Sequence, residues 1–217
     1  MLKELLDNAL DATEHPQALE AYARTGDAPM VHVVWQPHPD PDLVQLTVVD
    51  NGVGISPATV QRILNFATRT SDKAVYRSPT RGAQGNALKT VLGIPWALGV
   101  RVPVVIEAQG LRHTITVSVD PAGNVHVQRD ETPVPVQPGT RVTLTVRADQ
   151  DGQPTDWPRA FALFNPHVSV KICQEPHPGL ALLTAGVSLR RFLPSDRRLP
   201  RPLAEIPAWR SHVGLVV

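Results

Sequence analysis

Residues 43–55, Leu-Val-Gln-Leu-Thr-Val-Val-Asp-Asn-Gly-Val-Gly-Ile, decide the fold of this chain. The run up to Val49 is rich in β-branched residues and predicts a strand. A similar run, Val31–Trp35, precedes it across a turn rich in Pro, Asp and His, so we expect two neighbouring strands. Two glycines, Gly52 and Gly54, follow within four residues of Asp50. This pattern fits either a hairpin turn or a site where backbone and the Asp50 carboxylate meet a flat ligand.

Helical and extended patterns alternate along the rest of the chain. Helices at both ends of a run of antiparallel strands predict an α+β fold, a two-layer sandwich whose sheet is covered on one face by helices. We expect Phe161, Phe164 and Val168 in its core. The predicted helices are 2–15, 16–24, 57–66, one from Gly85 onward and 155–164, and the further strands are 102–107, 112–119, 125–129, 140–146 and 168–171.

The composition is that of an ordinary globular protein. The chain has 217 residues, 42% of them hydrophobic, and a formal net charge of +1. The single Cys173 excludes an internal disulfide and a cysteine-based zinc site. The longest apolar stretch, 91–106, is broken by Pro95, Arg101 and Pro103, so no membrane span is expected. Without a signal-peptide pattern at its start, we expect a cytoplasmic protein.

The first predicted helix carries Glu4, Asn8 and Asp11 at i, i+4 and i+7, which places all three on one face. A carboxylate beside an amide oxygen on a rigid face can hold a water and a Mg²⁺ ion, because Mg²⁺ prefers a few oxygen ligands and keeps several waters. The same spacing also fits a solvated acidic face of an amphipathic helix.

Residues 81–89, Arg-Gly-Ala-Gln-Gly-Asn-Ala-Leu-Lys, form a glycine-bearing loop that opens an apolar helix. Free N–H groups at a helix N-terminus bind phosphate, and glycines let the backbone approach it closely. The spacing is neither that of a P-loop nor G-x-G-x-x-G, and an ordinary loop-to-helix junction has the same look. Lys89 would then either add charge near a phosphate or be a surface lysine.

Taken in order, the three motifs resemble those of the GHKL ATPase superfamily, the Bergerat fold shared by type II topoisomerases, MutL, histidine kinases and heat-shock chaperones. They are E-x-x-x-N-x-x-D-A at 4–12, D-x-G-x-G at 50–54 and G-x-x-G-x-A-L at 82–88. Thr140 heads a late strand, where this family carries a threonine beside the adenine. Within the superfamily, the phrases GTRVTLTV at 139–146 and RRFLPSDRRLPRPLAEIP at 190–207 resemble the B subunit of topoisomerase VI.

The resemblance implies ATP and Mg²⁺ as ligands. Glu4 would be the general base that activates water, Asn8 the Mg²⁺ ligand and Asp50 the acceptor for the adenine amine. Residues 67–81 would form a lid over the nucleotide. The remaining expected nucleotide contacts are Asp11, Gly52, Gly54, Ile55, Gly82, Ala83, Gln84, Gly85, Asn86, Ala87, Leu88, Lys89 and Thr140.

We expect an ATP-binding domain over 1–175 and a Pro/Arg-rich extension over 176–217 that leads toward an absent second domain. By resemblance, the chain is the ATPase part of a type IIB DNA topoisomerase, in which ATP binding drives formation of a homodimer and gating of DNA. Another chain would supply the DNA-cleaving A-type subunit. Because the chain begins just before Glu4, an N-terminal strap exchanged between protomers is not expected. A MutL-like or chaperone-like clamp, and a nucleotide-binding module with little turnover, remain open. The C-terminal arginines either contact DNA or belong to a solvated linker.

Overall fold

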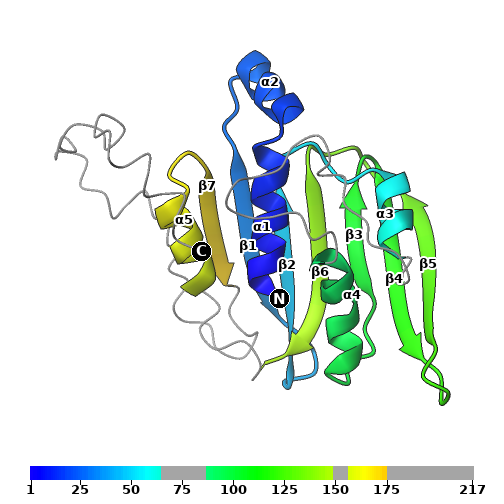
Figure 1. The fold of residues 1–217 in the computed structure, drawn as a ribbon. Coiled ribbons are helices and arrows are strands. Elements are labelled where there is room, and N and C mark those ends of the chain that lie inside the picture. The colour runs from blue at the N-terminus through cyan, green and yellow to red at the C-terminus, as the bar shows by residue number, and fades with distance from the viewer. Residues whose placement is uncertain (65–86, 149–155, 175–217) are drawn as a thin grey trace, which may run out of the picture.

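The computed structural model describes residues 1–64, 87–148 and 156–174, which form five helices and seven strands (Figure 1). The helices are α1 (Leu2–Thr13), α2 (Pro16–Thr25), α3 (Pro57–Ile63), α4 (Ala87–Ala97) and α5 (Asp156–Phe164). The strands are β1 (Met30–Pro37), β2 (Leu43–Asp50), β3 (Val104–Ala108), β4 (Leu111–Val119), β5 (Val125–Pro133), β6 (Thr140–Arg147) and β7 (Ser169–Gln174).

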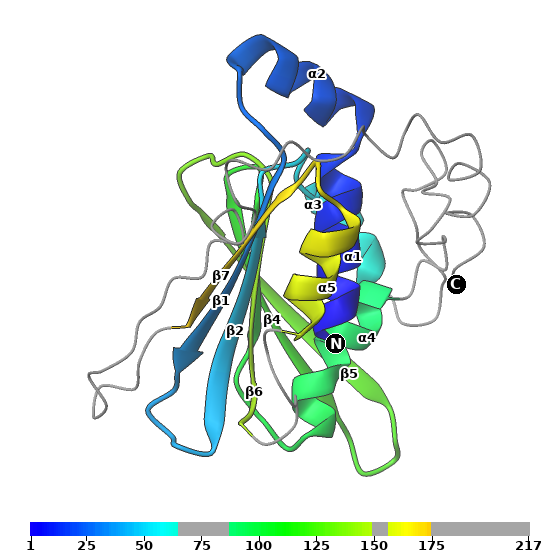
Figure 2. The same cartoon turned by 90° about the vertical axis from the view of Figure 1, so that its left-hand side faces the viewer.

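All seven strands belong to one sheet with the order β5-β4-β3-β6-β2-β1-β7. The β1–β7 pair is parallel and the other pairs are antiparallel. Seen edge-on, α1, α4 and α5 lie on one face of the sheet (Figure 2). The predicted α+β sandwich, with its mixed and mostly antiparallel sheet, is therefore confirmed.

The core lies between α1, α4 and the covered face of the sheet. Leu5, Leu6 and Leu10 of α1 are buried, because the i, i+1, i+5 spacing turns them toward the strands. On β1, the alternate residues Val31 and Val33 are fully buried on the same face. Each such side chain contributes about 1.5–3 kcal/mol when removed from water.

Local sequence sets the ends of several helices. Pro16 stands at the start of α2, and the His15 imidazole accepts a hydrogen bond from the Gln17 N–H at 3.3 Å. Gly26 ends the helix in the left-handed conformation, with φ at 78°. Ser56 caps α3 through the Thr59 N–H at 3.1 Å.

Several details of the sequence prediction differ from the structure. The first helix ends at Thr13 rather than 15, and the strand expected to end at residue 129 continues to Pro133, because β5 pairs with the whole of β4. Phe164 is 80% exposed at the end of α5, so its expected place in the core is wrong; Val168 is buried, and Phe161 packs against the core. The expected lid, 67–81, and the expected extension, 176–217, lie outside the described residues.

Candidate functional site

Asp50 lies at the end of β2, in the middle of the sheet, and its side chain is turned toward the helices. The residue is 5% exposed. One carboxylate oxygen, Oδ1, accepts hydrogen bonds from the backbone N–H groups of Gly52 at 2.8 Å and of Thr140 at 3.2 Å. No hydrogen bond to the other oxygen, Oδ2, is found among the described residues. One oxygen therefore holds the loop, and the second is left for another donor.

Burial raises the pKa of Asp50 to about 7, although the two backbone N–H donors act in the opposite direction. A carboxyl group with such a pKa is only partly ionised near neutral pH. A donor that reaches Oδ2 stabilises the ionised form and lowers this pKa again. The site thus favours a ligand that brings an N–H or O–H group to the end of β2.

The strand β6 begins beside this loop and closes the other side of the site. The Thr140 hydroxyl accepts a hydrogen bond from the Ile55 N–H at 3.2 Å. Gly139, directly before it, has φ at 77°, and a Cβ there would collide with the Asp50 backbone carbonyl. Gly54 also has a positive φ, 74°, and a Cβ on it would lie 2.9 Å from the Gly139 carbonyl oxygen. Glycine is required at both positions to bring β2 and β6 together.

The loop after β2 packs directly against the C-terminal end of α1. A Cβ on Gly52 would collide with the Ala12 backbone, and the Val53 N–H approaches the Ala12 carbonyl oxygen at 3.4 Å. The absence of a side chain at Gly52 is thus explained by helix packing. Because β2 leads into α3 and pairs only with β1 and β6, the hairpin alternative for this loop is wrong.

The polar face of α1 is only partly solvated. Asp11 is 7% exposed, and Asp7 is also buried and forms an ion pair with Lys3 at 2.7 Å. The Glu4 side chain remains 39% exposed. The alternative of a solvated acidic face is therefore wrong for Asp11, which is buried.

The Asn8 side chain has a polar group that a bound ligand could pair with. Its amide nitrogen Nδ2 is buried without a hydrogen-bond partner. An unpaired buried amide is costly, and which end of the amide carries the oxygen is a matter of assignment. Within the described ranges, no group of three or more His, Cys, Asp or Glu side chains could hold a metal ion. A metal here would therefore depend on an amide oxygen, waters and the oxygens of a bound ligand, a set that suits Mg²⁺.

The start of α4 packs beside α1. Lys89 is 5% exposed, so the alternative of a surface lysine is wrong. Leu88 packs against the core and anchors the first turn. The first N–H groups of a helix, here from Ala87 onward, have no partner within the helix. The loop residues Gly82, Ala83, Gln84, Gly85 and Asn86 lie outside the described residues.

Sequence reasoning missed the structural part played by Asn51. Its side-chain oxygen accepts hydrogen bonds from the Met30 N–H at 2.8 Å and from the Tyr22 hydroxyl at 3.0 Å, and its amide donates to the Ala28 carbonyl at 2.9 Å. Asn51 thereby ties α2 and the start of β1 to the loop after β2. Burial raises the pKa of Tyr22 to about 12, so the phenol remains a donor. The only signal was the position of Asn51 between Asp50 and Gly52.

Comparison with known proteins agrees with this geometry. Residues 1–150 match the family model described as histidine kinase-, DNA gyrase B-, and HSP90-like ATPase. The chain is also similar to the chaperone protein HtpG of Mesorhizobium japonicum (strain LMG 29417 / CECT 9101 / MAFF 303099), with 28% identity over 155 residues. That alignment covers 68% of this chain and 24% of the HtpG protein, so the chain spans a minor part of its relative's length.

The chain belongs to the histidine kinase-, DNA gyrase B- and HSP90-like ATPase family, the GHKL superfamily. It is therefore an ATP-binding module with the sandwich of that superfamily. No helix in the described part of the chain is long and apolar enough to cross a membrane.

Proposed function

We propose that this chain binds Mg²⁺-ATP between α1, the loop after β2 and the start of α4, and hydrolyses it. The observation that carries the proposal is the Asp50 carboxylate, which is buried, bonded through one oxygen only and located where β2, β6 and α1 meet. Its second oxygen would accept the adenine amine. Ile55 and Thr140 would complete the adenine site, with Gly52 and Gly54 shaping the backbone around it.

The phosphates would extend from Asp50 along α1. Asn8 lies about 6 Å along the helix axis from Ala12, the residue that touches Gly52, and Glu4 lies about 12 Å from it. A nucleotide that places its base at Asp50 therefore brings its phosphates past Asn8 toward Glu4. Bound Mg²⁺ would neutralise charge on the phosphate oxygens. Asn8 would hold the ion, and Asp11 would support the pocket.

Glu4 would act as the general base. Its carboxylate is partly exposed, and Glu4 lies farthest along α1 from Ala12 of the three polar residues on this face. A carboxylate in this position can orient a water molecule toward the terminal phosphate and accept its proton. The Lys3 ammonium lies 3.8 Å from the Glu4 carboxylate.

Residues 82–88 and Lys89 would hold the phosphates from the other side. Main-chain N–H groups at the start of α4 and the buried Lys89 ammonium would supply positive potential there. The α1–α4 contact would fix this region relative to Glu4 and Asn8. Residues 67–81 would close over the nucleotide.

Calorimetric titration with a non-hydrolysable ATP analogue and Mg²⁺ tests the pocket directly. The wild type should bind, and Asp50→Asn should lose binding, because the acceptor oxygen is replaced by an amide of nearly equal size. Asp130→Asn makes the same charge change on exposed β5 and should bind as the wild type does. Equal binding by all three proteins would contradict the proposed adenine contact.

Phosphate release tests hydrolysis separately. Glu4→Ala should retain binding of the analogue and lose turnover, as expected for a general base. Turnover unchanged by Glu4→Ala would contradict its role. Binding without measurable turnover in the wild type would favour a nucleotide-binding module.

For the use of ATP, we propose a switch in which nucleotide binding drives the chain to dimerise and clamp a partner. The similarity to chaperone protein HtpG favours a chaperone-like clamp. ATP-dependent suppression of aggregation of a thermally unfolded client, absent in Glu4→Ala and Asp50→Asn, would support it. Sedimentation with and without the analogue would measure dimerisation.

The second candidate is the ATPase part of a type IIB topoisomerase, favoured by the phrases at 139–146 and 190–207. It would act on DNA together with an A-type cleaving subunit from another chain, and the arginines of 176–217 would contact DNA. ATP-dependent relaxation of supercoiled DNA on adding a candidate cleaving subunit would support it. Relaxation that does not depend on the chain's nucleotide pocket would exclude it.

A further inference from the structure

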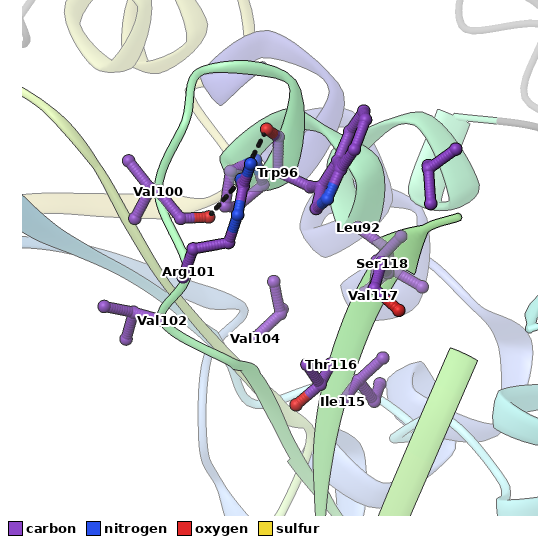
Figure 3. A pocket seen from close by; sticks show the side chains of 12 residues that line it. Leu92, Trp96, Val100, Arg101, Val102, Val104, Ile115, Thr116, Val117 and Ser118 are labelled. Carbon is purple, nitrogen blue, oxygen red and sulfur yellow. Dashed lines mark hydrogen bonds between the residues drawn. The ribbon is translucent and has the colours of Figure 1, made fainter. Parts of the chain in front are cut away.

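A second hollow lies away from Asp50, between the C-terminal half of α4 and the sheet (Figure 3). Its volume is about 300 Å³, at the lower end of the range for small-molecule sites. It lies at the opposite end of β3 from the proposed nucleotide site, because Ala108 pairs with Thr140 whereas Val104 lines the hollow. The four-residue step from Val104 to Ala108 corresponds to about 13 Å.

The hollow exists because β3 is shorter than β4. The last pair between these strands is Val104 with Ile115, and β4 continues for four more residues, Thr116–Val119, that pair with β5 alone. In the described part of the chain, no backbone hydrogen bond joins this extra stretch to residues 100–103. One edge of β4 therefore offers main-chain polar groups to an occupant.

The lining is mixed, because Thr116, Ser118 and the Arg101 cation lie among its apolar residues. Leu92, Val104 and Ile115 form the buried floor, and the Trp96 ring forms a wall. The Arg101 guanidinium carbon lies 5.2 Å from the centre of that ring. Figure 3 shows the Arg101 guanidinium beside Trp96, with Val104 below both in this view. A rigid aromatic wall and a positioned guanidinium favour a ligand with an apolar body and a negative end.

Arg101 retains hydrogen-bonding capacity for such a ligand. Its Nη1 donates to the Trp96 carbonyl at 2.9 Å and to the Val100 carbonyl at 3.5 Å, which fixes the side chain. Guanidinium has five N–H donors, so those on Nη2 and Nε remain. Among the described residues, no carboxylate forms an ion pair with Arg101. Within the described ranges, this exposed charge therefore lies beside the hollow without a counter-ion.

We propose that this hollow is a binding site for a small organic anion, an aromatic or branched carboxylate or sulfonate whose apolar part lies against Trp96 and Val104 and whose charge meets Arg101. The occupant is a single small molecule, because a volume of about 300 Å³ admits no more than a few rings. This proposal does not depend on the proposed ATPase function, since the two sites share no residue.

The test uses two fluorescent probes with the same rings, 1-anilinonaphthalene-8-sulfonate, which is anionic, and N-phenyl-1-naphthylamine, which is neutral. The full chain should bind one equivalent of each. Arg101→Gln should weaken binding of the anion about tenfold, because a charged hydrogen bond is lost, and change that of the neutral probe less than twofold. Arg147→Gln, at the exposed end of β6, is the matched control and should change neither.

Two further experiments test whether the probes bind in this hollow. Val117→Phe should weaken binding of both probes by filling the hollow, and circular dichroism will show whether this variant is folded. Saturating Mg²⁺-ATP should displace neither probe. The proposal is overturned by absence of saturable binding, by equal effects of Arg101→Gln on both probes, or by displacement with ATP, which would place the probe in the nucleotide site.

Discussion

Replacing Asp50 by asparagine is expected to stabilise the free protein at pH 8, although the residue lies at the centre of the proposed site. Asparagine resembles the protonated acid in size and can accept the Gly52 and Thr140 N–H bonds through its amide oxygen. It removes the charge that burial disfavours. A buried functional carboxylate lowers the free energy of unfolding, and its replacement by a neutral side chain raises it again.

The magnitude follows from the difference in pKa between the folded and unfolded chain. Asp50 titrates near 7 in the folded protein and near 3.8 when unfolded. Between these values, the folded state binds more protons, so the free energy of unfolding of the wild type falls as pH rises. Three pKa units correspond to about 4 kcal/mol. The Asp50→Asn advantage should be near zero at pH 4 and grow to about 4 kcal/mol above pH 7.

Urea denaturation of both proteins between pH 4.5 and pH 8 measures this difference. Asp120→Asn provides a control of opposite sign, because hydrogen bonds from Asn124 and His126 hold the pKa of that partly exposed carboxyl below its usual range. Replacing the Asp120 carboxylate should therefore lower the free energy of unfolding above pH 4. A difference between Asp50→Asn and the wild type that is the same at both ends of the pH range would refute the reasoning.

Three other substitutions test separate parts of the account. Gly139→Ala should lower the free energy of unfolding in urea by more than about 3 kcal/mol, because its Cβ would collide with the Asp50 carbonyl. Gly123 also has a positive φ but lies in open space, so Gly123→Ala should lower it by only about 1 kcal/mol. Equal losses in the two variants would contradict the close approach of Gly139 to Asp50. Tyr22→Phe should lower the unfolding free energy by about 1 kcal/mol, through loss of the hydroxyl bonds to the loop after β2, and an unchanged melt would show that they contribute nothing. Glu4→Ala should leave the unfolding free energy within about 0.5 kcal/mol of the wild type, because the side chain is partly exposed, while phosphate release is lost.

The sequence by itself determined the elements and their class. The helix of residues 2–13 follows from leucines at helical spacing, and the strands around Val33 and Leu46 follow from β-branched runs, because both patterns are local. The order of the three motifs also led to the GHKL superfamily, which the family match shows. Phe164 was misplaced because apolar character alone does not say whether the end of a helix is covered.

Only the tertiary structure decided which polar groups are buried and what they meet. The Thr140 N–H reaches the Asp50 carboxylate across 90 residues of sequence because β6 pairs with β2. Burial between these segments raises the pKa of Asp50, although this hydrogen bond acts in the opposite direction. The burial of Lys89 likewise depends on the packing around α4, and the hollow beside Arg101 on β3 ending before β4. These properties depend on distances between segments far apart in the chain, which no local pattern of residues contains.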